Sequence, residues 1–78
     1  MIRQYTRAGA SFLIVEQTSG GFYLYTFPKN GIAGDTWHQT LDDAKQQATC
    51  EFGDCLSFWE AVPTSVSDLR AFARDNSN

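Results

Sequence analysis

The segment ASFLIVEQTSGGFYLYTF, residues 10–27, is the feature that most constrains how this chain can fold. Residues 10–17 form a short run rich in β-branched and aromatic side chains, which is typical of a strand. The sequence TSGG follows, and its glycines favour a tight turn because glycine adopts positive φ angles at little cost. Residues 21–27 then predict a returning strand that ends at Pro28. We therefore expect a β-hairpin.

A helix is predicted after a short third strand at residues 35–39. Thr40 has the properties of a helix N-cap, and Asp43 three positions later makes the pattern close to a capping box. Asp42 and Asp43 also lie where the positive end of the helix dipole favours acids. Gly53 is suited to end the helix. The apolar residues of this stretch recur at spacings of three and four and so share one helix face: Leu41, Ala44, Ala48 and Phe52.

Two further elements are predicted towards the C-terminus. Residues 56–62, LSFWEAV, are typical of a last strand, which ends before Pro63. Ser65 and Asp68 repeat the capping pattern and predict a second helix. That helix is short and amphipathic, with its apolar face formed by Val66, Leu69, Phe72 and Ala73.

These elements predict a single α+β domain over residues 1–78. A chain of this length builds about two layers of secondary structure around a thin core. The expected order is β-β-β-α-β-α, with an antiparallel sheet of three or four strands and the helices on one face of it. Residues 1–9 and 75–78 are expected to be flexible.

Charge and composition narrow the classes of function. The formal net charge is -3, and the six Lys and Arg residues are scattered along the chain. Nucleic acid needs clustered basic side chains, so we expect no direct binding to it, and a basic protein partner fits the charge better. No segment approaches the ~20 apolar residues of a membrane span, and the N-terminal residues lack the features of a signal peptide. We therefore expect a cytoplasmic protein with no membrane contact and with reduced cysteines.

The candidate catalytic residues do not form a recognisable pattern. If Trp37 packs into the core, His38 faces away from it, and a general base needs a nucleophile or an orienting carboxylate within reach. Asp35 is a candidate for that carboxylate, although nothing in the sequence requires the pairing. Asp42 and Asp43 are adjacent on a helix, so their side chains diverge. We expect no catalytic residue and no enzyme; a small hydrolase or nuclease using His38 and Asp35 is the alternative.

The cysteines do not predict a metal site. Cys50 and Cys55 are separated by four residues, whereas zinc sites usually use CxxC pairs and four ligands in total. His38 lies about twelve residues before Cys50, which is roughly 18 Å along a helix. The glycines of residues 20–34 do not match a phosphate-binding loop either. We therefore expect no metal and no cofactor.

Aromatic side chains are the feature that these elements leave unexplained. Strand alternation places Tyr23, Tyr25 and Phe27 on one face, and helices on the opposite face would leave this face open. Tyr and Trp are enriched in protein interfaces. Two alternatives are burial beneath residues 2–7 or the loop 28–35, and a small-molecule pocket. The predicted interaction surface comprises Tyr23, Tyr25, Phe27 and Trp59.

Two resemblances follow from these motifs. The stretch GDTWHQTLDDAKQQATCEFG, residues 34–53, resembles small bacterial proteins of unassigned function with a GDTWH, DAKxQA and EFG pattern, over about residues 22–63. This resemblance implies a soluble bacterial domain and no particular activity. More loosely, GGFYLYTFP, GDT and LDDAKQQA resemble the N-terminal domain of HicB-type antitoxins, although WHQ here separates GDT from the helix. That resemblance implies a partial ribonuclease-H-like β-β-β-α-β fold and a basic toxin as partner.

The sequence therefore favours a non-catalytic protein-interaction module that uses the aromatic face, either with another protein or as a homodimer. A HicB-like antitoxin is the alternative among binding proteins.

Overall fold

The computed structural model describes residues 2–9, 11–28, 31–53 and 58–76. Within them the elements follow the order β1 (Arg3–Ala8), β2 (Ser11–Gln17), β3 (Phe22–Phe27), β4 (Gly34–His38), α1 (Leu41–Phe52), β5 (Glu60–Ala61) and α2 (Leu69–Asn76). The predicted α+β class and antiparallel sheet are confirmed, and the described residues form a sheet of five strands instead of three or four.

The sheet is built around the predicted hairpin. Its strand order is β4-β3-β2-β1-β5, and every neighbouring pair is antiparallel. In the hairpin, Phe12 lies opposite Phe27 and Ile14 lies opposite Tyr25. The central strand is fully buried at four successive positions, which are Phe12, Leu13, Ile14 and Val15. Because successive strand residues face opposite sides, both faces of the sheet are covered at its middle.

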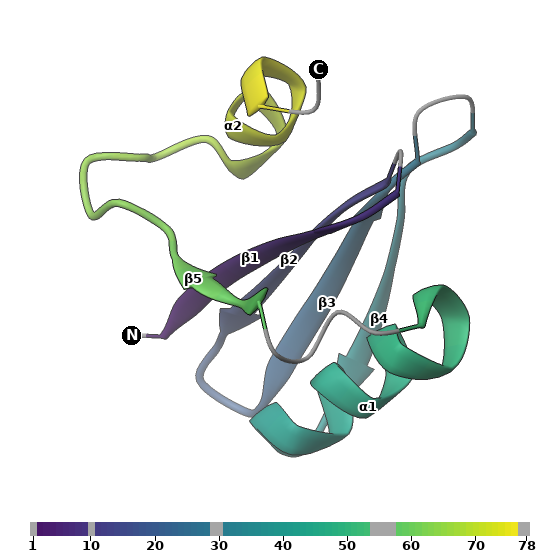
Figure 1. The fold of residues 1–78 in the computed structure, drawn as a ribbon. Coiled ribbons are helices and arrows are strands. Elements are labelled where there is room, and N and C mark those ends of the chain that lie inside the picture. The colour runs from purple at the N-terminus through teal and green to yellow at the C-terminus, as the bar shows by residue number, and fades with distance from the viewer. Residues whose placement is uncertain (1, 10, 29–30, 54–57, 77–78) are drawn as a thin grey trace.

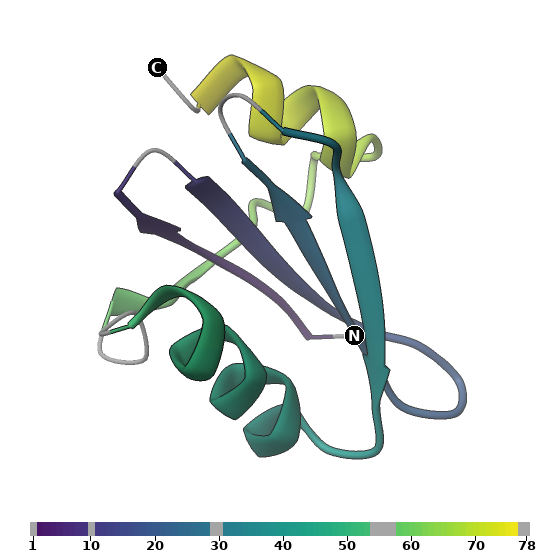
Figure 2. The same cartoon turned by 90° about the vertical axis from the view of Figure 1, so that its right-hand side faces the viewer.

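The two helices lie on opposite faces of the sheet, as Figures 1 and 2 show. Ala44 and Ala48 of α1 pack with Leu13, Val15 and Leu24 on one face. The other face carries a second cluster, in which α2 takes part: Phe12, Ile14, Val62 and Ala73. The prediction of helices on one face was therefore wrong. The physical reason is that β2 is apolar on both faces, so each face needs its own cover.

The ends of the helices are set by caps. Thr40 Oγ1 accepts a hydrogen bond of 3.1 Å from the backbone N–H of Asp43, which confirms the predicted N-cap of α1. Gly53 has a φ of 84° and donates its N–H to the carbonyl of Thr49, which confirms its terminating role. In α2 the cap differs from the prediction, because Asp68 Oδ1 accepts from the N–H of Ala71. Asp68 is therefore itself the N-cap, and the helix begins at Leu69.

Strand β1 was missed from the sequence, which predicted that residues 1–9 are flexible. Its α2-facing side carries two arginines that reach across to the C-terminal segment. Arg3 Nη1 donates to the carbonyl of Val66 at 2.8 Å, and Arg7 Nε donates to the carbonyl of Asn76 at 3.0 Å. These contacts tie β1 to both ends of the α2 region. Residues 75 and 76, also expected to be flexible, form the last turn of α2.

Gly21, in the turn between β2 and β3, is needed for a different reason from the one predicted. Neither Gly20 nor Gly21 has a φ in the left-handed region. A Cβ placed on Gly21 would lie 2.5 Å from the carbonyl oxygen of His38 and 2.6 Å from the Cζ2 atom of Trp37. Gly21 is therefore required by the close approach of β4 and not by the backbone conformation of the turn.

Candidate functional site

An aromatic strip lies on the α2-facing side of strands β3 and β4; we define it as Tyr23, Tyr25 and Trp37. The strand register places Trp37 directly opposite Tyr23. The rings of Tyr23 and Tyr25 stack with their centroids 5.8 Å apart and their planes inclined by 13°. Tyr25 also borders the core beneath α2, whereas Trp37 lies on the edge strand. The strip thus extends from the margin of α2 to the edge of the sheet.

Trp37 is the most exposed member of the strip, and one side of its indole packs against the backbone. Its side chain is 48% exposed, although it is a large hydrophobic residue. The indole lies against Gly21, which offers no side chain that would displace it. The exposed ring is therefore supported by backbone and presented to solvent, as expected for a preformed contact surface.

Two carboxylates flank the strip. In the register, Glu16 lies opposite Tyr23 and Asp35 lies opposite Tyr25. The hydroxyl of Tyr25 donates a hydrogen bond of 3.0 Å to Glu16 Oε1. Burial raises the pKa of Tyr25 to about 12, with further contributions from the hydrogen bond to Glu16 and from the charges of Glu16 and Asp35. The tyrosine is therefore a neutral donor at physiological pH in a locally negative environment.

A groove separates the strip from α2. It consists of two adjoining hollows of about 320 and 170 Å³, both lined by Tyr25, Phe27 and Arg70. Asp68 lines the larger hollow and Asp35 the smaller one. The described side chains that line this groove thus combine aromatic surface with charges of both signs.

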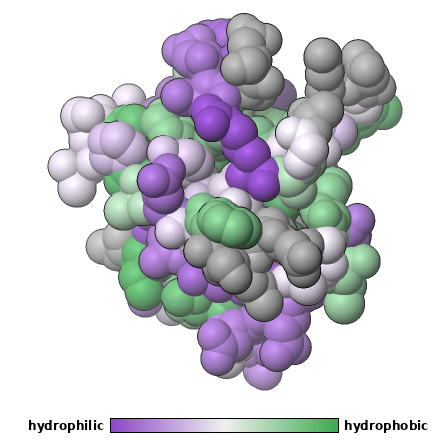
Figure 3. Space-filling view, viewed as in Figure 1, coloured by the Kyte–Doolittle hydropathy of each residue, from purple (hydrophilic) through white to green (hydrophobic). Residues whose placement is uncertain are grey.

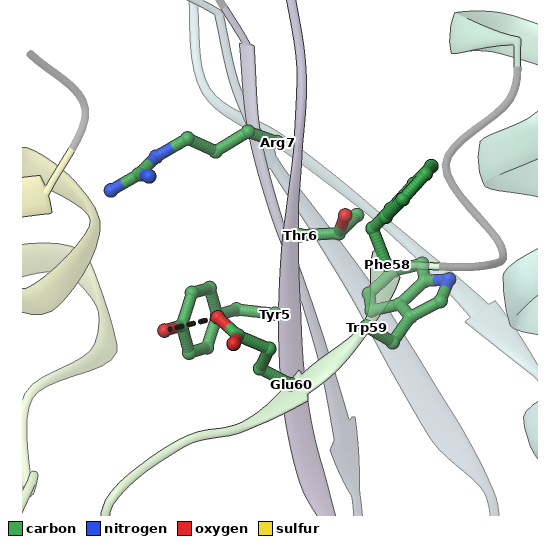
Figure 4. Close-up of a pocket in the computed structure, with 6 residues that line it drawn as sticks. All are labelled: Tyr5, Thr6, Arg7, Phe58, Trp59 and Glu60. Atoms are coloured by element: carbon green, nitrogen blue, oxygen red, sulfur yellow. Dashed lines mark hydrogen bonds between the residues drawn. The ribbon is translucent and has the colours of Figure 1, made fainter.

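A second cavity, of about 460 Å³, lies at the opposite edge of the sheet, where β5 stops pairing with β1. Figure 4 shows Tyr5 and Arg7 pointing from β1 towards α2, while Thr6 points towards Phe58 and Trp59. The polar groups on the α2 side already have partners within the protein. The hydroxyl of Tyr5 donates to Glu60 Oε2 at 2.9 Å, and this hydrogen bond is the main cause of its raised pKa.

The contacts of this cavity assign a structural role to it. Arg7 holds the carbonyl of Asn76 at the end of α2, and its guanidinium lies 5.6 Å from the ring centroid of Phe12. Thr6 is 2% exposed, and its Oγ1 has no hydrogen-bond partner among the described residues. On the face shown in Figure 3, which is viewed as in Figure 1, the apolar side chains of the described residues lie in separate areas between polar ones.

The structure brings together only part of the predicted interaction surface. Tyr23, Tyr25 and Phe27 share one face, but Phe27 packs with the core beneath α2. Trp59 lies on the α1 side, with Lys45 Nζ 5.4 Å from its ring centroid, so including it was wrong. The register explains this, because Glu60 pairs with Tyr5 and shares its face, which turns the preceding residue to the other side.

Sequence reasoning also missed Trp37 as a surface residue. Its strand was predicted, and pairing that strand with residues 22–27 by alternation would have placed Trp37 beside Tyr23. The prediction that these aromatic residues lie on a sheet face without helices was also wrong. The strip does not lie on a face free of helices, because α2 packs on that face against residues of β1, β2 and β3.

The residues weighed for catalysis and metal binding lie apart. Asp35 and His38 are three positions apart on β4 and therefore face opposite sides of the sheet. His38 Nε2 lies 2.7 Å from Thr36 Oγ1. Cys50 is exposed, whereas Cys55 lies outside the described residues. Within the described ranges, no group of three or more His, Cys, Asp and Glu side chains could hold a metal ion.

The helices of the described part of the chain are all too short or too polar to cross a bilayer. Comparison with known proteins adds no relative: no protein-family model matches the chain, and no curated protein or solved structure matches it. The site must therefore be interpreted from its own geometry.

Proposed function

We propose that this protein is a non-catalytic interaction module that binds a protein partner through the aromatic strip. The observation that carries the proposal is the position of Trp37, which is 48% exposed beside two stacked tyrosines. Trp37 is exposed and Tyr23 and Tyr25 are half-buried, and apolar groups that cluster at a surface mark interaction sites more often than residues scattered singly. Tyrosine and tryptophan are also the residue types that most often anchor protein interfaces.

The rigidity of the strip supports this function. All three rings are carried by paired strands, and Trp37 rests on the backbone at Gly21. A surface that is already ordered loses little conformational entropy on binding, so more of the contact energy contributes to affinity. The separation of Asp35 from His38 on opposite faces also favours binding over hydrolysis at this site.

The proposal is tested by removing the exposed rings while keeping the fold. The double variant Trp37→Ser and Tyr23→Ser should lose the protein partners that the wild type captures from its native cell extract, as identified by mass spectrometry. Circular dichroism should show retained secondary structure, because neither residue belongs to the fully buried core. Phe58→Ser is the matched control, since Phe58 is 69% exposed and lies elsewhere. Partner capture that is unchanged in a folded double variant would exclude the strip as the interface.

A further inference from the structure

Within the part of the chain that the structure describes, the outer edge of β4 is an open sheet edge next to the aromatic strip. β4 is the terminal strand of the sheet, and its residues 34–37 are all exposed. The backbone groups that face outwards can be assigned from the hydrogen-bond pattern. Val62 N–H donates to the carbonyl of Arg3, so the backbone N–H and C=O groups of Arg3 point towards β5. Alternation across the three registers from β1 to β4 then leaves the N–H and C=O groups of Asp35 and Trp37 pointing away from β3.

We propose that the partner contributes an extended, basic segment that adds to β4 as a further strand and lays Lys or Arg side chains over the aromatic strip. This inference rests on the proposed function and specifies its partner and its mode of binding. Strand addition of this kind uses main-chain hydrogen bonds for affinity and alternate side chains for specificity.

The backbone geometry determines which partner residues meet the strip. An added strand would pair through the outward groups of Asp35 and Trp37, each of which offers one donor and one acceptor. The side chains of these two residues lie on the strip side of the sheet. Partner residues directly opposite them therefore project onto that same side, and every second partner side chain lies beside Trp37 and Asp35.

The charges near the strip select a cationic partner. Asp35 lies on β4 itself, and Glu16 lies two strands inwards beside Tyr23. A cation placed over Trp37 or Tyr23 gains attraction from the ring face and from these carboxylates. Arg70 of α2 lines one hollow with Asp35 and the other with Glu16 and Asp68, so three carboxylates outnumber this guanidinium among the described residues that line the groove. The formal net charge of -3 further favours association with a basic segment.

The same charges disfavour a second copy of this chain as the occupant. Antiparallel pairing of β4 with itself would bring two Asp35 side chains onto the same face of a short pairing. Each copy would also add a net charge of -3. Like charges at adjacent positions across strands are unfavourable. A second copy is therefore an outcome that the experiment must distinguish.

The test uses two synthetic peptides with alternating threonine, one with lysine and one with glutamate at the intervening positions. Isothermal titration calorimetry with the full chain should show binding of the lysine peptide only, weakened by added salt. Asp35→Asn should reduce affinity for the lysine peptide about 2- to 5-fold, as expected for the loss of one exposed charge contact. Amide NMR shifts should concentrate at Asp35 and Trp37.

A second substitution at the same position isolates the backbone contribution. Asp35→Pro removes an outward N–H that β3 does not use, so the sheet should persist while peptide binding falls further than in Asp35→Asn. Thr36→Ala is the control, because Thr36 lies on the other face and its backbone faces β3. Equal affinities of Asp35→Pro and Asp35→Asn would overturn strand addition.

The remaining outcomes separate this inference from the proposed function. Equal binding of both peptides, or binding of neither, would overturn the inference that a basic segment adds to β4. The proposed function of the aromatic strip would still hold if the Trp37→Ser and Tyr23→Ser double variant lost the native partners. A concentration-dependent dimer in sedimentation experiments that Asp35→Pro abolishes would identify the occupant as a second copy and would also overturn the inference.

Discussion

At the scale of single residues, Gly21 links the turn of the hairpin to the exposed tryptophan. An added methyl group would meet the carbonyl oxygen of His38 at 2.5 Å as well as the indole of Trp37. Backbone cannot yield as a flexible side chain does, so we expect Gly21→Ala to destabilise the fold by about 1–3 kcal/mol, as overpacking does. Urea unfolding measures this loss, and tryptophan fluorescence should change because the ring is displaced.

Gly20→Ala is the matched control for this prediction. Gly20 also has a φ outside the left-handed region, and a methyl group added to it would meet nothing within 4 Å. Its stability should therefore change little. Equal stability of the two variants would show that the contact between Gly21 and β4 is not required.

Tyr25 gives a prediction for the pH dependence of stability. Its pKa is raised from 10.0 to about 12, first by burial and then by Glu16. Because the pKa of Tyr25 is higher in the folded than in the unfolded state, its neutral phenol stabilises the fold. This stabilisation is fully present below pH 10 and is lost as the pH rises through 12. Ultraviolet titration of the phenols should show an ionisation near pH 12 that disappears in Tyr25→Phe, while the Tyr5 phenol, whose pKa is also raised, remains. Ionisation of every phenol near pH 10 would contradict the assignment.

At the scale of the elements, the sequence predicted those with strong local signals. The hairpin of β2 and β3 and the cap at Thr40 depend on residues close together in the chain. β1 lacked such a signal because its arginines gain their partners only from the distant residues Val66 and Asn76. In the same way, Asp68 was placed inside α2 instead of at its cap, because two capping residues stand close together in the sequence.

The candidate site was only half predictable for the same reason. Alternation along β3 correctly grouped Tyr23 with Tyr25. The addition of Trp37 depends on the register between β3 and β4, and the exclusion of Trp59 depends on the register between β1 and β5. Cross-strand registers join residues that are distant in sequence, so single-strand patterns do not determine them.

At the scale of the whole molecule, a thin domain is stabilised by two small cores on opposite faces of one sheet. Phe72 of α2 joins the second core through ring contacts with Tyr5 and Phe12, at centroid distances of 5.2 and 5.9 Å. Because β2 contributes buried residues to both cores, loss of one core should weaken the other. We therefore expect α2 to unfold together with the sheet in a single transition.

Phe72→Ala tests this coupling. The substitution should cost about 2–4 kcal/mol, as truncation of a packed aromatic residue does, and this is a large share of the stability of so small a domain. Urea unfolding followed by circular dichroism and by tryptophan fluorescence should give coincident curves at a lower midpoint. Phe58→Ala is the control, because that ring is 69% exposed and its loss should shift the midpoint little. Loss of helical signal before any change in fluorescence would mean that α2 detaches by itself, and the two cores would then be energetically independent.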